Sequence, residues 1–388
     1  MWQGAKICAC LRAHERIYYE IDFPSLHRGG GAPCTSSGFP LGLKERTDYY
    51  RGSAPPRTNK SSERVPSVRV VSLFSGAGGL DLGLTQAGHR VVWANDNDPD
   101  AVGTYRKNIG NHIVLSDIEL LRSREIPKAD VVVGGFPCQG FSQANMLRFE
   151  KDERNKLYLE FLRVVRDLKP MYFLAENVRG ILSLAAGKAI ERIERDFASA
   201  GYRVKKRLFN VADYGIPQNR RRVIISGTRA DLPDEADFLF PQPTHAAPEE
   251  ALLLGLMPWV TIREALRGLP EPGTKNAEKI PNHIFSQYKV TNRNFTGHRW
   301  TDPDKPSPTI LARGNGKGGV CAIQHPGNHR RMSIRESAVI QTFPLDFEFI
   351  GKMNSCYRQV GNAVPVLFAR KLGEELARKA RLLRGKAA

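Results

Sequence analysis

The stretch Ala129–Ser142, ADVVVGGFPCQGFS, decides the fold, because in it a buried strand runs directly into a loop that carries a cysteine. Residues 129–133 are nearly all apolar, which is typical of a parallel strand covered on both faces. The Gly and Pro residues that follow predict a tight loop that holds Cys138 out of the core. Open α/β sheets bind their ligands at the carboxyl ends of their strands. We therefore expect the Cys138 thiol to face a substrate, although most cysteines are small buried side chains.

A glycine turn follows the first strand-like run of the core. Arg69–Phe74 (RVVSLF) leads into Ser75–Gly79 (SGAGG) and then into a helical pattern over residues 80–87. A strand, a glycine turn and a helix form a cradle for nucleotide-like ligands. A dinucleotide fingerprint requires a third glycine at position 81, where this chain has Asp81, so the pyrophosphate-binding pattern is incomplete. The alternative is an ordinary tight turn.

Carboxylates stand at the ends of three further strand-like runs, at Asp96, Asp117 and Glu176. A carboxylate at the end of the second strand can accept hydrogen bonds from ribose hydroxyls. One at the same sheet edge as a cysteine lies within reach of that cysteine for acid–base chemistry. For an isolated residue, helix capping or a solvated turn would be the commoner role.

Composition favours a polyanionic partner. Lys+Arg 58 and Asp+Glu 40 in 388 residues give a formal net charge of +18, which favours a polyanion. The length predicts about two structural units and a tail. Six cysteines without a C-x-x-C pair predict reduced thiols, no disulfide framework and no metal site. The sequence has no long apolar span, and we expect a soluble, intracellular protein that does not use a membrane.

Taken together, these segments resemble the DNA (cytosine-5) methyltransferase family. Residues 134–142 resemble its catalytic Pro-Cys motif, and QNRRR over 218–222 matches its Q-x-R-x-R motif at Gln218, Arg220 and Arg222. Three later blocks follow in the family's order, PSPTILAR (306–313), SIRESAVIQTFP (333–344) and YRQVGNAVP (357–365). The resemblance covers the chain from Arg69 to about Leu376.

The resemblance implies a doubly wound α/β fold, the Rossmann-like fold of S-adenosylmethionine-dependent methyltransferases, with a second, smaller target-recognition domain. The expected parts are a flexible N-terminal extension (1–66), a catalytic and cofactor-binding domain (67–235), a target-recognition domain (236–354) and a C-terminal helix returning to the catalytic domain (355–388). Between residues 227 and 306 the alternation of strand and helix patterns breaks down. This break favours a separate recognition region there.

The resemblance also implies methyl transfer from S-adenosylmethionine to C5 of a cytosine in double-stranded DNA. C5 is a poor nucleophile, so a thiolate must first add at C6, which is the role of Cys138. Glu176 would hydrogen-bond or protonate N3, Arg222 would hold the O2 side, and Arg220 would face the same catalytic site. The cytosine must be flipped out of the stack to be reached.

For the cofactor, the resemblance implies contacts from the glycine turn, from the acidic strand ends and from the C-terminal block that returns to the sheet. Phe74 would pack against the adenine, Asp96 would accept the ribose hydroxyls, and Asp117 would meet the adenine amine. The expected cofactor-binding residues are Phe74, Ser75, Gly76, Ala77, Gly78, Gly79, Leu80, Asp96, Asn97, Asp117, Ile118, Pro137, Leu157, Asn362 and Ala363.

DNA contacts are expected from the loop after the cysteine and from the Asn- and Arg-rich recognition region, because Asn and Arg pair with adenine and guanine edges. The expected DNA-binding residues are Ser142, Gln143, Asn292, Arg293, Arg299 and Arg313. The expected partners are double-stranded DNA and, in a restriction system, a cognate endonuclease encoded nearby. A monomer would suffice, located in the cytoplasm and associated with the nucleoid through DNA.

Three other functions share features with this one. A zinc nucleobase deaminase requires a second cysteine where this chain has Phe141, and an H-x-E partner that the sequence lacks, which excludes it. An RNA (tRNA) cytosine-5 methyltransferase would use the same core, and the separate recognition region favours DNA over it. A catalytically inactive DNA-binding relative is the third, but Cys138, Glu176, Arg220 and Arg222 are all present.

Overall fold

The functional site is built on one twisted sheet. The computed structural model describes residues 67–385 except 138–155, 288–299, 313–322 and 328, so the predicted extension over 1–66 lies outside it. Within the described residues, seven strands form this sheet in the order β3-β2-β1-β4-β5-β8-β6. The strands are β1 (Arg69–Leu73), β2 (Arg90–Asp96), β3 (Ile113–Leu115), β4 (Val131–Gly134), β5 (Tyr172–Val178), β6 (Tyr202–Asn210) and β8 (Arg221–Arg229).

The sheet has a parallel part and an antiparallel part. Strands β1 to β5 are parallel, and β8 lies antiparallel between β5 and β6. The central strands β1 and β4 are almost wholly buried, as expected for strands covered on both faces. Consecutive residues of β1 point to opposite faces, so Val70 and Val71 belong to different hydrophobic clusters.

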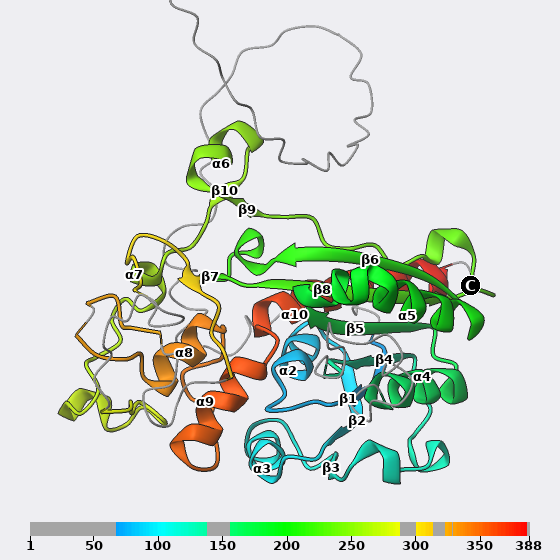
Figure 1. Cartoon of the computed structure of the whole chain (residues 1–388), viewed down its shortest axis with the longest axis horizontal. Helices are drawn as coiled ribbons and strands as arrows, with labels where there is room; N and C mark the ends of the chain where they lie inside the picture. Colours follow the sequence, from blue (N-terminus) through cyan, green and yellow to red (C-terminus); the bar gives the residue numbers. More distant parts are fainter. Residues whose placement is uncertain (1–66, 138–155, 288–299, 313–322, 328, 386–388) are drawn as a thin grey trace, which may run out of the picture. The chain divides into compact units, whose positions relative to one another are not determined.

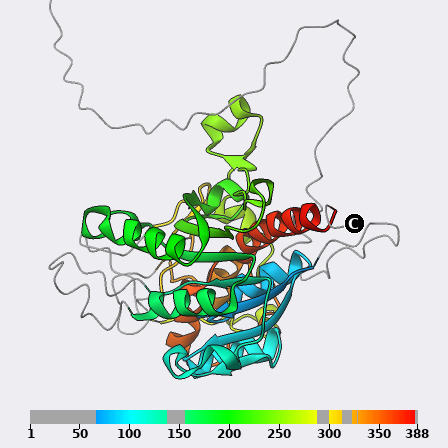
Figure 2. The same cartoon turned by 90° about the vertical axis from the view of Figure 1, so that its right-hand side faces the viewer.

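Helices cover both faces of the sheet (Figures 1 and 2). One face packs against α2 (Gly79–Gln86), α3 (Pro99–Asn108) and α10 (Val366–Gly385). The other packs against α4 (Lys156–Leu168) and α5 (Lys188–Ser199). This arrangement confirms the predicted doubly wound α/β fold.

A third hydrophobic cluster consists of Ala77 and buried residues between 262 and 366. The remaining strands and α-helices outside the seven-stranded sheet are short, because turns and capping interactions interrupt them within a few residues. They are β7 (Gln218–Asn219), β9 (His245–Ala246), α6 (Pro248–Leu254), β10 (Met257–Pro258), α7 (Ile262–Ala265), β11 (Ser307–Pro308), α8 (Ile334–Ile340) and α9 (Met353–Asn362). The sequence TIREALRGL over residues 261–269 is typical of a short helix, and the structure forms one turn there, α7, which begins at a capping box between Thr261 and Glu264.

Short 3-10 helices connect the larger elements. They span Ile118–Leu120, Ser123–Glu125, Arg179–Leu182, Leu184–Gly187, Val211–Tyr214, Asp234–Ala236 and Lys275–Ala277. None of the helices in the described part of the chain is both long enough and apolar enough to span a membrane.

Candidate active site

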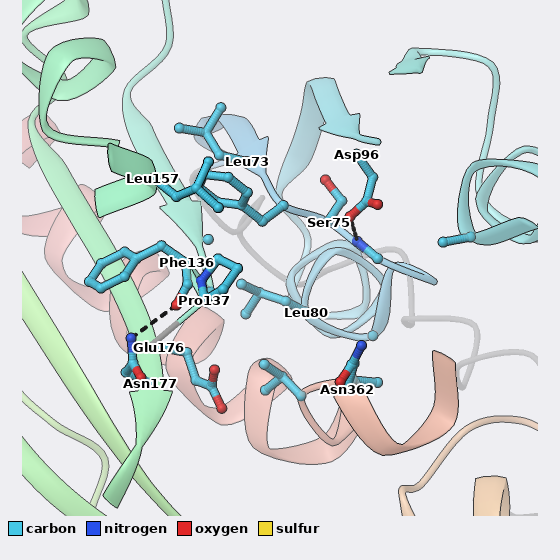
Figure 3. A pocket seen from close by; sticks show the side chains of 18 of the residues that line it. Leu73, Ser75, Leu80, Asp96, Phe136, Pro137, Leu157, Glu176, Asn177 and Asn362 are labelled. Atoms are coloured by element: carbon cyan, nitrogen blue, oxygen red, sulfur yellow. Dashed lines mark hydrogen bonds between the residues drawn. The ribbon is translucent and has the colours of Figure 1, made fainter. Parts of the chain in front are cut away.

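The strand order creates a crevice at one edge of the sheet. From β1 the chain proceeds to β2 and β3 on one side, whereas β4 and β5 extend the sheet on the other side. The connections leave β1 and β4 in opposite directions, which opens a space at their carboxyl ends. A cavity of about 780 Å³ lies at this edge, lined by residues of both halves of the sheet and of the α9–α10 junction (Figure 3).

Nearly all the residues expected to bind a cofactor line this cavity. They are Phe74, Ser75, Gly76, Ala77, Gly79, Leu80, Asp96, Asn97, Asp117, Ile118, Pro137, Leu157, Asn362 and Ala363. Gly78 is the exception. It precedes α2 with φ of 86°, and a Cβ there would overlap Ile109 and crowd Tyr105. Gly78 therefore shapes the turn from behind the cavity wall.

The glycine turn is tied to the neighbouring strands. Ser75 N donates to Asn95 O at 2.9 Å, and Gly76 N donates to Asp96 Oδ2 at 2.8 Å. Behind the turn, Ser72 Oγ donates to Asp81 Oδ1 at 2.6 Å. The position that breaks the dinucleotide fingerprint is thus occupied by a fully buried carboxylate that joins β1 to α2.

Asp96 has two acceptor oxygens that face different partners. Oδ2 accepts from Gly76 N, and Oδ1 accepts from Asp98 N at 2.9 Å. Burial raises the pKa of Asp96, and these backbone N–H groups oppose the rise. A carboxylate has about four acceptor positions, so Asp96 retains capacity for a ligand. Asn97 Nδ2 donates to Asp117 Oδ1 at 2.6 Å, which joins two further wall residues.

Glu176 reaches the other end of the cavity. It lies inside β5, where Glu176 pairs with Ile224 and Val178 pairs with Arg222 of β8. The alternation of side chains therefore places Glu176 and Arg222 on the same face as diagonal neighbours. Figure 3 shows Glu176 near Pro137, away from Asp96 and the glycine turn.

The Glu176–Arg222 contact is an ion pair without an aligned hydrogen bond. Arg222 Nε lies 2.8 Å from Glu176 Oε1, and the two side chains are only 11% and 13% exposed. Nevertheless, no donor of the described residues is directed at the buried Oε1 for a hydrogen bond. The charge of Arg222 offsets part of the cost of burying this carboxylate, but Oε1 keeps free acceptor positions. This oxygen is thus available to a donor group of a bound molecule.

Arg220 also lines the cavity, but its guanidinium is engaged by the backbone. Nη1 donates to Ile310 O at 2.8 Å, and Nη2 donates to Gly361 O at 2.9 Å and Ala363 O at 3.1 Å. Burial lowers the pKa of Arg220 well below its ordinary value, Arg222 lowers it further, and Glu176 opposes both. Its hydrogen bonds are thus directed to main-chain carbonyls.

The remaining expected site residues lie outside the described part of the chain. They are Cys138, Ser142, Gln143, Asn292, Arg293, Arg299 and Arg313. Pro137, which directly precedes the cysteine, does line the cavity. Asn177 Nδ2 donates to Phe136 O at 3.0 Å and so holds the base of this loop against β5.

Several wall residues were missed by sequence reasoning. They include Asn95, Asp98, Ser116, Asn177, Arg358 and Gln359. Asp98 had a readable signal, because an Asp before Pro99 is a typical N-cap, and its Oδ1 accepts from Asp100 N at 3.0 Å. Arg358 lies in the YRQVGNAVP block, and its Nη2 donates to Asp98 Oδ2 at 2.8 Å across the cavity wall.

Comparisons with known proteins identify the family of this chain. The family C-5 cytosine-specific DNA methylase matches residues 68–378. The Type II methyltransferase M.NgoFVII of Neisseria gonorrhoeae is 40% identical over 318 residues, covering 76% of this chain and 83% of that protein. The Type II methyltransferase M.BspRI of Lysinibacillus sphaericus is 36% identical over 366 residues, covering 79% and 81%.

A solved structure supports the fold alone. The Dnmt2 methyltransferase of S. pombe superposes with a TM-score of 0.60 at 19% identity, covering 81% of this chain and 99% of that one. The family match spans most of the chain, including the glycine turn, Glu176, Arg220, Arg222 and the C-terminal block over residues 357–365. The chain therefore belongs to the C-5 cytosine-specific DNA methylase family and is a DNA (cytosine-5) methyltransferase.

Proposed function

We propose that this protein methylates C5 of a cytosine flipped out of double-stranded DNA, through a covalent bond between Cys138 and C6 and with S-adenosylmethionine as the methyl donor. One observation carries the proposal. A single cavity has the glycine turn and Asp96 at one end, and the Glu176 carboxylate beside Arg222 and Pro137 at the other. Two ligands can therefore meet in one space.

The residues at the first end fit an adenosyl cofactor. A volume of about 780 Å³ lies within the range of small-molecule sites, roughly 300–1,000 Å³. Asp96 retains acceptor capacity for ribose hydroxyls, and Phe74, Ile118 and Leu157 offer apolar contacts for a base. Gly76, Gly79, Asn362 and Ala363 would line the remainder. When bound, S-adenosylmethionine supplies the methyl group.

The residues at the second end would act on the base. The Cys138 thiolate forms a bond to C6. The π electrons of the C5–C6 double bond then shift toward C4 and N3, which makes C5 nucleophilic. Glu176 would stabilise that charge at N3 by hydrogen bonding or protonation, and Arg222 would hold both Glu176 and the O2 side. C5 would then form a bond to the methyl group as the bond between that methyl and the sulfonium sulfur breaks, which would leave S-adenosylhomocysteine. A base then removes the C5 proton, the C5–C6 double bond re-forms and Cys138 leaves as a thiolate.

The proposal includes the biological role, the partner and the location of the enzyme. The Type II relatives favour a modification enzyme that protects a short DNA site, with a cognate endonuclease as a candidate partner. Double-stranded DNA as the substrate favours a cytoplasmic enzyme associated with the nucleoid. A monomer suffices to act on one strand at a time. The target-recognition region is proposed to span residues 236–354, with DNA contacts from the residues expected above.

Bisulfite sequencing tests the proposal directly. Plasmid DNA from a methylation-free host that expresses the protein should contain protected cytosines in one recurring short context. The matched control, Cys138→Ala, should leave every cytosine unprotected while DNA binding survives, because affinity comes largely from phosphate contacts. Protection by the Cys138→Ala variant would refute the covalent mechanism. An absence of protection with the folded parent protein, together with methyl transfer to tRNA, would favour the RNA alternative.

A further inference from the structure

Three buried polar side chains form a network between the sheet and the α9–α10 junction. Gln218 in β7 and Gln341 at the end of α8 are fully buried, and Arg220 is 1% exposed. Buried polar groups are costly unless their hydrogen bonds are satisfied. Their partners therefore indicate what the network holds in place.

The network binds both sides of one peptide segment. Gln218 Oε1 accepts from Ile310 N at 2.9 Å, and Arg220 Nη1 donates to Ile310 O at 2.8 Å. β11, two residues before Ile310, pairs with β7. The segment after β11 is thus fixed to the segment that joins β7 to β8 by two side chains, in addition to the short β7–β11 ladder.

The same network caps the C-terminal end of α9. Gln341 Nε2 donates to Val360 O at 2.7 Å and Ala363 O at 3.1 Å, and Arg220 Nη2 donates to Gly361 O and Ala363 O. The last carbonyls of a helix lack intrahelical partners, so these side chains satisfy groups that would otherwise be unpaired. Gln218 Nε2 donates to Gln341 Oε1 at 2.8 Å and completes the connection.

The two bound segments lead to different ligands of the proposed reaction. Asn362 and Ala363 line the cavity at the end of α9, where we propose the cofactor binds. Ile310 lies in the region proposed to read DNA. The segments also touch, since a Cβ at Gly361 would overlap the backbone of Leu311 and Ala312. One guanidinium therefore joins the cofactor side to the recognition side.

We infer that Arg220 is a positioning residue that, with Gln218 and Gln341, sets the cofactor-binding end of α9 against the DNA-recognition segment at Ile310. Arg220 acts through main-chain carbonyls, so it need not touch the reacting base. This inference rests on the proposed function. A guanidinium suits the task because its planar fork can serve carbonyls from two segments at once, which a lysine ammonium on a flexible stem cannot do as well.

Binding of S-adenosylhomocysteine to the free protein, measured by calorimetry without DNA, tests the inference. Arg220→Met should raise the dissociation constant by about tenfold or more, the loss expected when charge-assisted hydrogen bonds that hold the site are removed. Arg222→Met should bind S-adenosylhomocysteine like the parent and lose single-turnover methylation. Unchanged binding by Arg220→Met with slow single-turnover chemistry would overturn the inference. It would indicate instead that Arg220 acts directly on the target cytosine.

Two further variants separate positioning from general destabilisation. Tyr202→Phe removes a buried hydrogen bond to Pro170 O, 2.8 Å long, at the end of β6 remote from Arg220, because Tyr202 pairs with Arg229 whereas Asn210 pairs with Arg221. It should lower the thermal midpoint without changing the dissociation constant, and an equal loss of binding in this variant would overturn the inference.

If Arg220→Met does not fold, Gln341→Met removes a neutral donor to the same turn and should also weaken binding. A parent protein that fails to bind S-adenosylhomocysteine would refute the proposed cofactor instead.

Discussion

The two ends of the cavity differ in how their polar groups are satisfied. At the glycine-turn end, Asp96 accepts two backbone N–H groups and Asp117 accepts from Asn97. At the Glu176 end, Arg222 lies 2.8 Å from an oxygen that has no aligned hydrogen-bond donor among the described residues. At the first end, protein groups donate hydrogen bonds to both carboxylates. At the second end, the Glu176 oxygen is ion-paired but accepts no aligned hydrogen bond from the described residues.

This difference matches the different tasks proposed for the two ends. A cofactor site benefits from a preformed wall, because ordering loops on binding costs free energy. A catalytic carboxylate benefits from an acceptor that is satisfied only when the base arrives, because interactions that strengthen toward the transition state raise the rate. Substitutions at the two ends should therefore affect binding and chemistry separately.

The largest effect is expected at the Glu176 end. Glu176→Gln keeps the size of the side chain but removes the charge and the exchangeable proton, so single-turnover methylation should fall by about 10²–10⁴-fold. Binding of S-adenosylhomocysteine should stay within about twofold of the parent, because the variant leaves the glycine-turn end intact. Single-turnover transfer of labelled methyl to DNA and calorimetry measure the two quantities.

A surface variant provides the control for Glu176→Gln. Glu194→Gln on α5 removes a carboxylate that pairs with Lys206 and lies outside the cavity. It should leave both quantities unchanged. Parental rates in the Glu176→Gln variant would show that the unsatisfied oxygen has no part in the chemistry, and the contrast between the two ends would then have no catalytic meaning.

The sheet was predictable from the sequence wherever its strands are buried on both faces. Residues 129–133 contain a continuous apolar run, and β4 lies there. The edge strand β6 (YRVKKRLFN) was missed, because one side of an edge strand is exposed and basic residues occupy it. Most of the short elements between residues 236 and 354 were also missed, since helices of one or two turns depend on tertiary packing rather than on a local pattern; α7 is the exception.

The candidate site divides in the same way. Most of the expected cofactor residues converge because parallel strands deliver their carboxyl ends to one edge, and that rule can be applied to a sequence. The contacts of Arg220 could not be predicted, because its partners are backbone carbonyls 90, 141 and 143 positions away. No spacing of residue types encodes a hydrogen bond to a distant main chain.

A smaller effect, on stability, is expected behind the glycine turn. Asp81 accepts from Ser72 Oγ and from Tyr105 OH at 2.8 Å, and burial raises its pKa from 3.8 to about 6. Between these pH values the folded chain binds more protons than the unfolded chain, so this group makes the free energy of unfolding fall as pH rises from about 4 to about 6. Asp81→Asn removes that dependence.

Denaturant unfolding of the parent and of Asp81→Asn at pH 4 and pH 7 measures this contribution. The stability of the variant relative to the parent should increase by on the order of 3 kcal/mol between the two pH values, following from a pKa rise of about two units. Other titrating groups cancel in the difference. A stability difference that does not change with pH would mean that the pKa of Asp81 is the same in the folded and unfolded chain. Burial of the ionised Asp81 would then not destabilise the fold.

The smallest effect is expected from Asp96→Asn, which alters a carboxylate at the preformed, glycine-turn end of the cavity. The amide keeps one acceptor but turns an NH2 group toward Gly76 N or Asp98 N, so the dissociation constant for S-adenosylhomocysteine should rise by about tenfold. Because burial raises the pKa of Asp96, affinity of the parent should fall as pH falls through that raised pKa, when the carboxylate gains a proton. The variant should lack this pH dependence.

The control is Asp130→Asn, a change at a carboxylate outside the cavity that accepts from Arg69 N. It should bind like the parent. Equal affinities of parent and Asp96→Asn across the pH range would remove Asp96 from the cofactor contacts, leaving its hydrogen bond to the glycine turn as a purely structural one.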